Sequence, residues 1–179
     1  MAGTTAICYC EHDSIRLVQS AKRQDADAFC ESYLNQFYPA FVMIDAPLSL
    51  PGVYQNRGDD YFFRQCDREL GAMSPMFLGG LTARAMRLSQ VWMKKGIVFY
   101  ETWPRRVAGR FGFGQSSGLD ERSVKAIVQQ IEAETACSLA ATIPSQHAFD
   151  ALLAWYAGWC AESKKIQRAG SDEEGWIYY

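Results

Sequence analysis

Two carboxylates, Asp45 and Glu101, each stand directly after a short run of apolar residues. The two runs, Phe41–Ile44 and Ile97–Tyr100, have the length and composition of strands that are buried on both faces, as in a parallel sheet. If these strands run parallel, their acids meet at one edge of the sheet, where open α/β folds place their sites. For either acid taken alone, a purely structural interpretation as a strand end or a turn cap stays open.

A third acid, Asp150, lies three residues after His147, near the start of an expected helix from 146 to 162 that Ser145 can cap. Residues three apart on a helix project from neighbouring positions of one face, so these two side chains could act together. The helix dipole alone also explains an acid in the first turn, and that interpretation stays open beside a catalytic one.

Three converging carboxylates would suit a hard divalent cation, because Mg²⁺ and Mn²⁺ prefer carboxylate, phosphate and water oxygens to thiolate. Two such ions about 3.5 to 4 Å apart can activate water and stabilise the leaving oxygen of a phosphate displacement. We therefore expect Asp45, Glu101 and Asp150 to bind Mg²⁺ or Mn²⁺, and His147 to orient Asp150 or assist proton transfer.

The elements that would position these acids alternate between strands and helices. A polar turn at 11–14 divides two short strands at the start of the chain, which predicts a hairpin. Apolar residues then recur at helical spacing. The expected helices cover residues 25–37, 57–70, 81–95, a segment around 124–131, and 146–162. This order predicts a mixed α/β sheet, parallel in its centre, with helices on both faces. Gly112, Gly114 and Gly118 indicate a mobile loop.

Several segments, taken in order, resemble the successive motifs of a predicted ribonuclease-H-like nuclease family, domain of unknown function 429. The segments are Ile44–Pro51, Arg64–Arg68, Glu101–Pro104, His147–Leu152 and Glu174–Ile177. The helix that carries His147 and Asp150 also resembles the last helix of RuvC-type Holliday-junction resolvases. The resemblance covers almost the whole chain and implies a ribonuclease-H-like fold, with Asp45, Glu101 and Asp150 as metal-binding acids and His147 as an accessory.

The chain departs from this family at its start. Such proteins open with a central strand that carries Gly-x-Asp, and no such strand precedes Ala2-Gly3. The hairpin acid Asp13 is a poor substitute because it falls in the polar turn. Either the chain starts late or its site is degraded. Because a missing central strand leaves unpaired backbone edges, we expect the gap to be closed by direct pairing, by another chain or by a shifted element.

Four arginines are candidates for contacts with substrate phosphate: Arg64, Arg68, Arg105 and Arg106. Arg64 and Arg68 are one helical turn apart and match a family motif, but an internal ion-pair network with Asp67 is an equal alternative. Arg105 and Arg106 follow Glu101 closely, and a solvated helix face is the alternative there. The terminal segment 173–177 is expected to dock as a strand or a turn.

The composition limits the number of domains and the classes of partner and metal site. With 179 residues, 49% of them hydrophobic, one domain spanning 1–179 is the default. The net charge of −2 excludes general affinity for polyanions, so any contact with DNA or RNA must be local. The six cysteines lack zinc-site spacing and are expected to be reduced packing residues. We expect no membrane span and no export signal, which makes the cytoplasm the default compartment.

These patterns lead to two hypotheses of different classes. The first is a hydrolase: a nuclease or phosphodiesterase of the ribonuclease-H-like class that depends on Mg²⁺ or Mn²⁺ and is inactive in this form if the first acid is essential. The second is a non-catalytic nucleic-acid-binding or assembly protein that keeps the fold with an incomplete acid cluster, and homo-oligomer formation stays open. A nucleotide phosphohydrolase is disfavoured, because the opening strands lack a glycine-rich phosphate loop.

Overall fold

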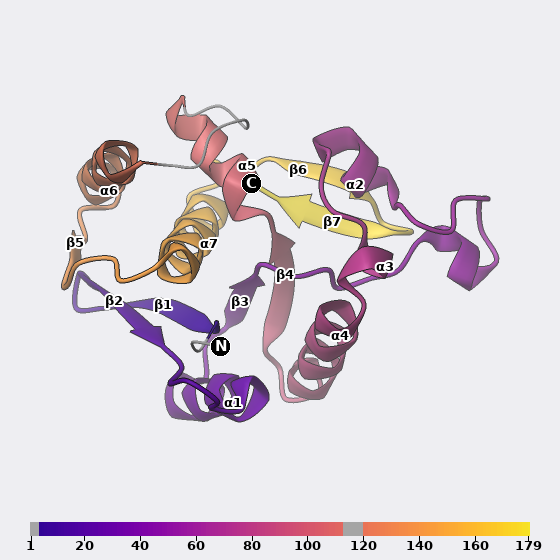
Figure 1. The fold of residues 1–179 in the computed structure, drawn as a ribbon, viewed down its shortest axis with the longest axis horizontal. Coiled ribbons are helices and arrows are strands. Elements are labelled where there is room, and N and C mark those ends of the chain that lie inside the picture. The colour runs from indigo at the N-terminus through magenta and orange to yellow at the C-terminus, as the bar shows by residue number, and fades with distance from the viewer. Residues whose placement is uncertain (1–3, 113–119) are drawn as a thin grey trace. The chain divides into compact units, whose positions relative to one another are not determined.

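The protein is described by a computed structural model, which covers residues 4–112 and 120–179. Gly114 and Gly118 of the expected loop lie outside these residues. The chain divides into two compact units, each made of two chain segments and described here by itself. Unit 1 comprises Met1–Phe37 with Pro104–Lys164, and unit 2 comprises Tyr38–Trp103 with Lys165–Tyr179. The described residues form seven α-helices and two mixed sheets, so the chain is an α/β protein (Figure 1).

The sheet of unit 1 has three strands in the order β1-β2-β5. The strands are β1 (Ala6–Glu11), β2 (Ser14–Gln19) and β5 (Ser138–Leu139). β1 and β2 form the hairpin that the sequence predicts, and its two turn residues, His12 and Asp13, both have positive φ. That is the conformation of the tight turns that match strand twist. β5 pairs with β2 in parallel.

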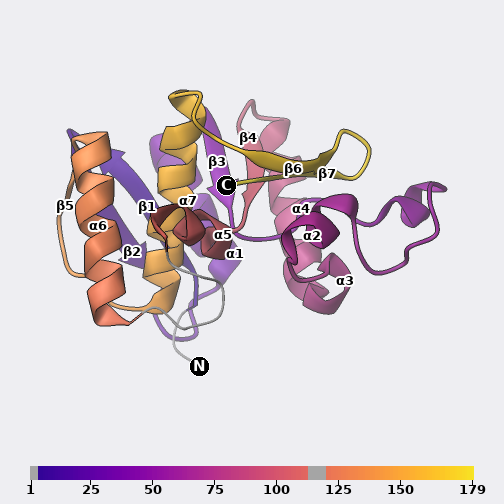
Figure 2. The same cartoon turned by 90° about the horizontal axis from the view of Figure 1, so that it is seen from above.

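Four helices belong to unit 1. They are α1 (Ala26–Phe37), α5 (Pro104–Ala108), α6 (Glu121–Thr135) and α7 (Gln146–Glu162), and the short 3-10 helix η2 (Gly109–Phe111) follows α5. α7 packs against β1 and β2, and α6 lies beside α7 (Figure 2). The predicted start of α7 is confirmed: the Ser145 hydroxyl accepts a hydrogen bond from the Ala148 N–H at 3.1 Å. Phe149, Leu152 and Leu153 then enter the core.

The sheet of unit 2 has four strands in the order β3-β4-β7-β6. They are β3 (Phe41–Ile44), β4 (Val98–Thr102), β7 (Gly175–Tyr178) and β6 (Arg168–Ser171). β3 and β7 both pair with β4 in parallel, and β6 pairs with β7 antiparallel. The terminal strand expected near 173–177 is therefore present as β7.

Three helices belong to unit 2: α2 (Gln65–Leu70), α3 (Pro75–Leu78) and α4 (Gly80–Met93), with the 3-10 helix η1 (Gly52–Gln55) before them. α4 agrees with the helix predicted over 81–95. The helix predicted over 57–70 is wrong in its first half. Residues 57–64 form turns and extended chain, because Asp60 and Arg64 bond local backbone and side-chain groups in place of a helical ladder.

The strands form two sheets in place of the single mixed sheet that the sequence predicts. β1 and β3, which the resemblance would place on either side of a first strand, are each the edge strand of their own sheet. No five-stranded sheet forms among the described residues. The prediction that β3 is buried on both faces is wrong: all four of its residues are half-buried. β3 is an edge strand, so one of its hydrogen-bonding edges has no neighbouring strand in the sheet.

Candidate functional site

The two acid-ended strands lie side by side in unit 2. β3 and β4 are parallel, as predicted, and Ile44 is the register partner of Glu101. Asp45, one residue beyond Ile44, therefore leaves the sheet at the same edge as Glu101. Glu101 differs from the prediction in one respect: it lies within β4, which continues to Thr102, and it is 6% exposed.

Both carboxylate oxygens of Glu101 bind one guanidinium. Nη1 and Nη2 of Arg64 donate to Oε2 and Oε1 of Glu101, each at 2.7 Å. The Leu48 N–H, in the turn after Asp45, donates to Oε2 at 2.9 Å. Parallel hydrogen bonds of this kind are short and geometrically specific. A metal ion at Glu101 would have to compete with this pair.

Arg64 is the centre of the arrangement. It is 0% exposed and also binds Asp67, with Nε donating to Oδ2 at 3.0 Å and Nη2 to Oδ1 at 2.7 Å. Burial opposes its charge, but the hydrogen bonds that Arg64 donates to Glu101 and Asp67 hold the pKa of Arg64 above its ordinary value. Arg64 was expected either to contact a substrate phosphate or to form an internal ion pair. The structure contains the internal ion pair, and a fully buried guanidinium is not accessible to a phosphate.

Glu174, in the C-terminal segment, is hydrogen-bonded to residues next to Arg64 and to Ser49, which Arg64 contacts. Oε1 of Glu174 accepts the Gly52 N–H and Oε2 accepts the Gln65 N–H at 2.7 Å, while the Ser49 hydroxyl donates to the Glu174 carbonyl. Arg64 Nη1 donates to Ser49 Oγ at 2.8 Å. Four of the five motif segments behind the family resemblance thus meet in one hydrogen-bonded network of unit 2, in which Arg64 and Asp67 are fully buried and Ser49 and Glu174 are half-buried.

The other two predicted site residues, His147 and Asp150, lie near the start of α7 in unit 1. The first turn contains His147 but no acid, so the expectation that Asp150 lies in the first turn is wrong by one residue. The Gln146 amide donates to Oδ1 of Asp150 at 2.9 Å, and His147 is exposed. Burial raises the pKa of Asp150 above its ordinary value. Across the residues that the structure describes, no three or more His, Cys, Asp and Glu side chains form a group that could hold a metal ion.

The remaining arginine candidates are distributed over both units. Arg68, on α2, pairs with Asp60 and lies over the Phe63 ring, 4.9 Å from its centroid. Arg105 and Arg106 are on α5 of unit 1, where Arg105 is exposed and Arg106 half-buried. The structure therefore does not gather the four arginines into one phosphate site within either unit.

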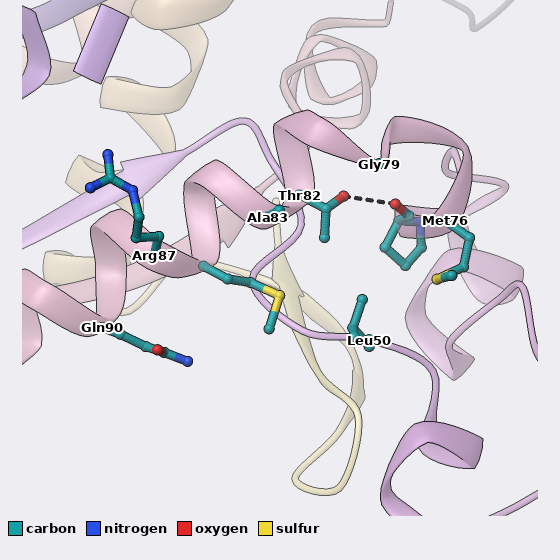
Figure 3. Close-up of a pocket in the computed structure, with 9 residues that line it drawn as sticks. Leu50, Met76, Gly79, Thr82, Ala83, Arg87 and Gln90 are labelled. Carbon is teal, nitrogen blue, oxygen red and sulfur yellow. Dashed lines mark hydrogen bonds between the residues drawn. The ribbon is translucent and has the colours of Figure 1, made fainter.

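A pocket that the sequence did not indicate lies between α3 and α4 of unit 2 (Figure 3). It measures about 450 Å³ and has a mainly apolar lining, to which Leu50, Met76 and Met86 contribute. In Figure 3, Arg87 and Gln90 lie toward one end and Met76 toward the other. The Thr82 hydroxyl donates to the Pro75 carbonyl at 2.8 Å and holds the start of α4 against α3.

Exposed aromatic and cationic groups occur on α3 and α4 and in the segments next to these helices. Phe77 is 65% exposed and lies 5.8 Å, centroid to centroid, from the exposed Phe62 ring. Between residues 71 and 96 the chain has no Asp or Glu, and its four cations are Arg84, Arg87, Lys94 and Lys95. The absence of acids from a stretch of this length is the sequence feature that could have located this surface. We call the exposed residues of this stretch, with Phe62, the α3–α4 surface.

Comparisons with known proteins add no identification: no family model, curated protein or solved structure matches this chain. None of the helices in residues 4–112 and 120–179 is both long and apolar enough to cross a lipid bilayer.

Proposed function

We propose that this chain binds single-stranded nucleic acid through the α3–α4 surface without cleaving it. In this proposal it is a protein of the ribonuclease-H-like class with an incomplete acid cluster. The observation that carries the proposal is the presence on one unit of a cationic stretch of sequence without acids, exposed aromatic rings and an apolar pocket.

The charge of the surface favours a polyanion locally. The whole chain has a net charge of −2, so its average field does not attract nucleic acid. Residues 71–96 carry cations alone, and the side chains of Arg84 and Arg87 are exposed. Lys and Arg that neutralise phosphates release counterions, which supplies sequence-independent affinity and makes binding depend on salt.

The apolar groups favour unpaired bases over a duplex. Proteins that bind single strands without sequence preference combine a cationic groove with aromatic side chains on which bases stack. Exposed Phe62 and Phe77 offer ring faces of this kind. The pocket has room for a nucleobase, and the Gln90 amide at one end of it can hydrogen-bond a polar base edge.

We expect no cleavage because the carboxylate of Glu101 is already bound by hydrogen-bond donors of the chain. Its two oxygens accept hydrogen bonds from Arg64 and from the Leu48 N–H, and the pair is buried. Removing Arg64 from the carboxylate to admit a metal ion would leave a buried cation without one of its partners, at a cost of several kcal/mol.

Fluorescence anisotropy with labelled single-stranded DNA, single-stranded RNA and duplex DNA of equal length tests the proposal. We expect single strands to bind more tightly than the duplex. A plot of the logarithm of the binding constant against the logarithm of the salt concentration should have a negative slope of about 0.7 for each phosphate neutralised. Arg87→Glu should weaken binding, whereas Arg105→Glu, a matched exposed arginine on unit 1, should leave it unchanged. Equal affinities of the two variants, or no binding at all, would overturn the proposal.

A second candidate function is a nuclease or phosphodiesterase that depends on Mg²⁺ or Mn²⁺, with DNA or RNA as substrate. The observation that favours it is the register of β3 and β4, which brings Asp45 and Glu101 to one sheet edge. Incubating the same oligonucleotides with each metal tests this function: cleavage that Asp45→Asn abolishes and Asp172→Asn does not would support it, and uncut oligonucleotide would reject it.

A further inference from the structure

Two thiols from distant parts of the chain lie close together in unit 1. The Cys10 thiol donates to the sulfur of Cys137, with 3.5 Å between the two Sγ atoms and 127 residues between the cysteines in the chain. The bond length of a disulfide is about 2.05 Å, so the sulfurs need to approach by only about 1.5 Å to bond. The sequence did not indicate this pair, because their spacing matches no motif.

The fold brings the two cysteines together through backbone pairing. Cys10 is near the end of β1, beside the hairpin turn. Cys137 connects Ala136, which ends α6 in a left-handed conformation (φ 57°), to β5. The next residue, Ser138, donates its N–H to the carbonyl of Asp13 in the hairpin turn at 2.9 Å. These bonds fix the segment around Cys137 at the hairpin end.

The two thiols differ in their access to solvent. Cys10 is exposed, whereas Cys137 is buried, with 8% exposure. A small disulfide in solution can therefore meet Cys10 first, with Cys137 in place behind it to complete the exchange. This division of roles requires one accessible thiol and one neighbouring thiol, which is what the geometry supplies.

We propose that Cys10 and Cys137 form a reversible disulfide by thiol–disulfide exchange with a low-molecular-weight disulfide such as oxidised glutathione. The Cys10 thiolate attacks one glutathione sulfur, forming a mixed disulfide and releasing one glutathione thiolate. The Cys137 thiolate then attacks Sγ of Cys10, the protein disulfide forms, and the second glutathione thiolate leaves. In total, two protein thiols are oxidised and one glutathione disulfide is reduced to two thiols.

Without such an oxidant the pair is stable as thiols. Burial, the hydrogen bond with Cys137 and the charges of Cys137 and Asp13 together raise the pKa of Cys10 to about 11, although a backbone hydrogen bond at Asp13 opposes the rise. Burial and the neighbouring Cys10 likewise raise the pKa of Cys8. Only the thiolate attacks a disulfide, so we expect the exchange to be slow at neutral pH and to accelerate as the pH rises toward the pKa of Cys10.

The disulfide would tie α6 and β5 to the hairpin. β5 has only two residues, and α6 is otherwise held by its buried side chains Ile127 and Ile131 and by the bond of Tyr156 to Glu134. A cross-link that closes a loop of this length restricts the unfolded chain strongly. We expect oxidation to raise the melting temperature by roughly 5 to 15 °C and to slow amide exchange in α6 and β5.

The test is oxidation of the full chain with glutathione disulfide, followed by alkylation of the remaining thiols, intact mass measurement and peptide mapping. We expect the loss of two of the six alkylatable thiols and a cross-linked peptide that joins Cys10 to Cys137. A reducing agent should restore both thiols and the original melting temperature. A cross-link between Cys8 and Cys10, or no cross-link, would overturn the proposal.

Variants separate the two roles. Cys137→Ser should trap a stable glutathione adduct on Cys10, because the thiol that displaces the glutathione in this proposal is absent, and Cys10→Ser should block both the adduct and the cross-link. Cys30→Ser, a cysteine of α1 in the same unit, is the matched control and should oxidise as the unmodified chain does. Since Cys10 is exposed, Cys10→Ser is expected to keep the fold, which circular dichroism checks. An unchanged cross-link yield in this variant would also reject the proposal.

Discussion

Arg64 and Glu101 form a buried, two-pronged ion pair, with Nη1–Oε2 and Nη2–Oε1 distances of 2.7 Å each. Asp67 binds the same guanidinium from the other side, so one cation is shared by two acids. A motif residue that could have contacted phosphate instead lies in the interior of unit 2. The stability of this unit should therefore depend on the pair.

Arg64→Met should destabilise the protein by about 3 to 5 kcal/mol, because it leaves two buried carboxylates without their cation. Glu101→Gln should also destabilise it, and the double variant should be less destabilised than the sum of the single changes, because the two residues interact directly. Urea denaturation measures all three. The control is Arg68→Met, whose exposed pair with Asp60 should contribute no more than about 1 kcal/mol. Similar losses at positions 64 and 68 would contradict the prediction.

Gly170→Ala should destabilise unit 2 by at least about 2 kcal/mol. Gly170 has a φ of +119°, and a Cβ there would lie 2.3 Å from the Gly175 carbonyl oxygen and 2.9 Å from Cβ of Cys66. The β6–β7 pairing would have to separate locally. Gly71→Ala is the matched control: its φ of +68° is also strained, but nothing lies within 4 Å of the added methyl group. Thermal melts that rank Gly71→Ala as the more harmful change would refute this account.

Asp60 should titrate at unusually low pH. Hydrogen bonds from the Phe63 and Phe62 N–H groups, together with the bond from Arg68, lower the pKa of Asp60 from 3.8 to about 2. A carboxyl whose folded pKa is depressed contributes stability above its unfolded pKa, and this contribution is lost as pH falls from about 4 through 2. Carboxyl NMR titration measures the pKa directly. A value at or above 3.8 would contradict the prediction, and Asp60→Asn should flatten stability over this acid range.

Phe77→Ala should weaken the binding of single-stranded nucleic acid by roughly 5-fold to 150-fold, the loss expected for one stacked base. The ring is 65% exposed, so the variant should keep its free energy of unfolding within about 1 kcal/mol. Anisotropy titration measures the affinity. Phe37→Ala, which removes an exposed ring from α1 of unit 1, should have no effect on binding. Equal losses in both variants would show that Phe77 has no particular role.

Elements whose signals are local could be predicted from the sequence. Ser145 predicted the start of α7 because its hydroxyl caps a backbone N–H three residues later. The apolar run Phe41–Ile44 predicted β3 with its bounds. The division into two sheets could not be predicted, because hydrogen bonding between strands depends on chain segments far apart in sequence. β5, with two residues, is too short to leave a periodic pattern.

The candidate site shows the same limit. The parallel register of β3 and β4, and with it the shared edge of Asp45 and Glu101, followed from two similar runs. The partner of Glu101 could not be predicted, because Arg64 is far from Glu101 in the chain. An arginine can also bind a phosphate as well as it binds a carboxylate. Only the burial of Arg64 selects the carboxylate. The Cys10–Cys137 pair likewise depends on a contact across 127 residues.

The two carboxylate oxygens of Glu174 accept N–H groups from Gly52 and Gln65, more than a hundred residues earlier in the chain. A nascent chain that has left the ribosome only as far as Trp103 thus has β4 but neither β7 nor this carboxylate. Unit 2 must wait, with β4 lacking one neighbour, while the whole second segment of unit 1 is translated. Exposed strand edges of this kind attract other chains, so we expect unit 2 to be most prone to association with other chains in the interval before β7 emerges.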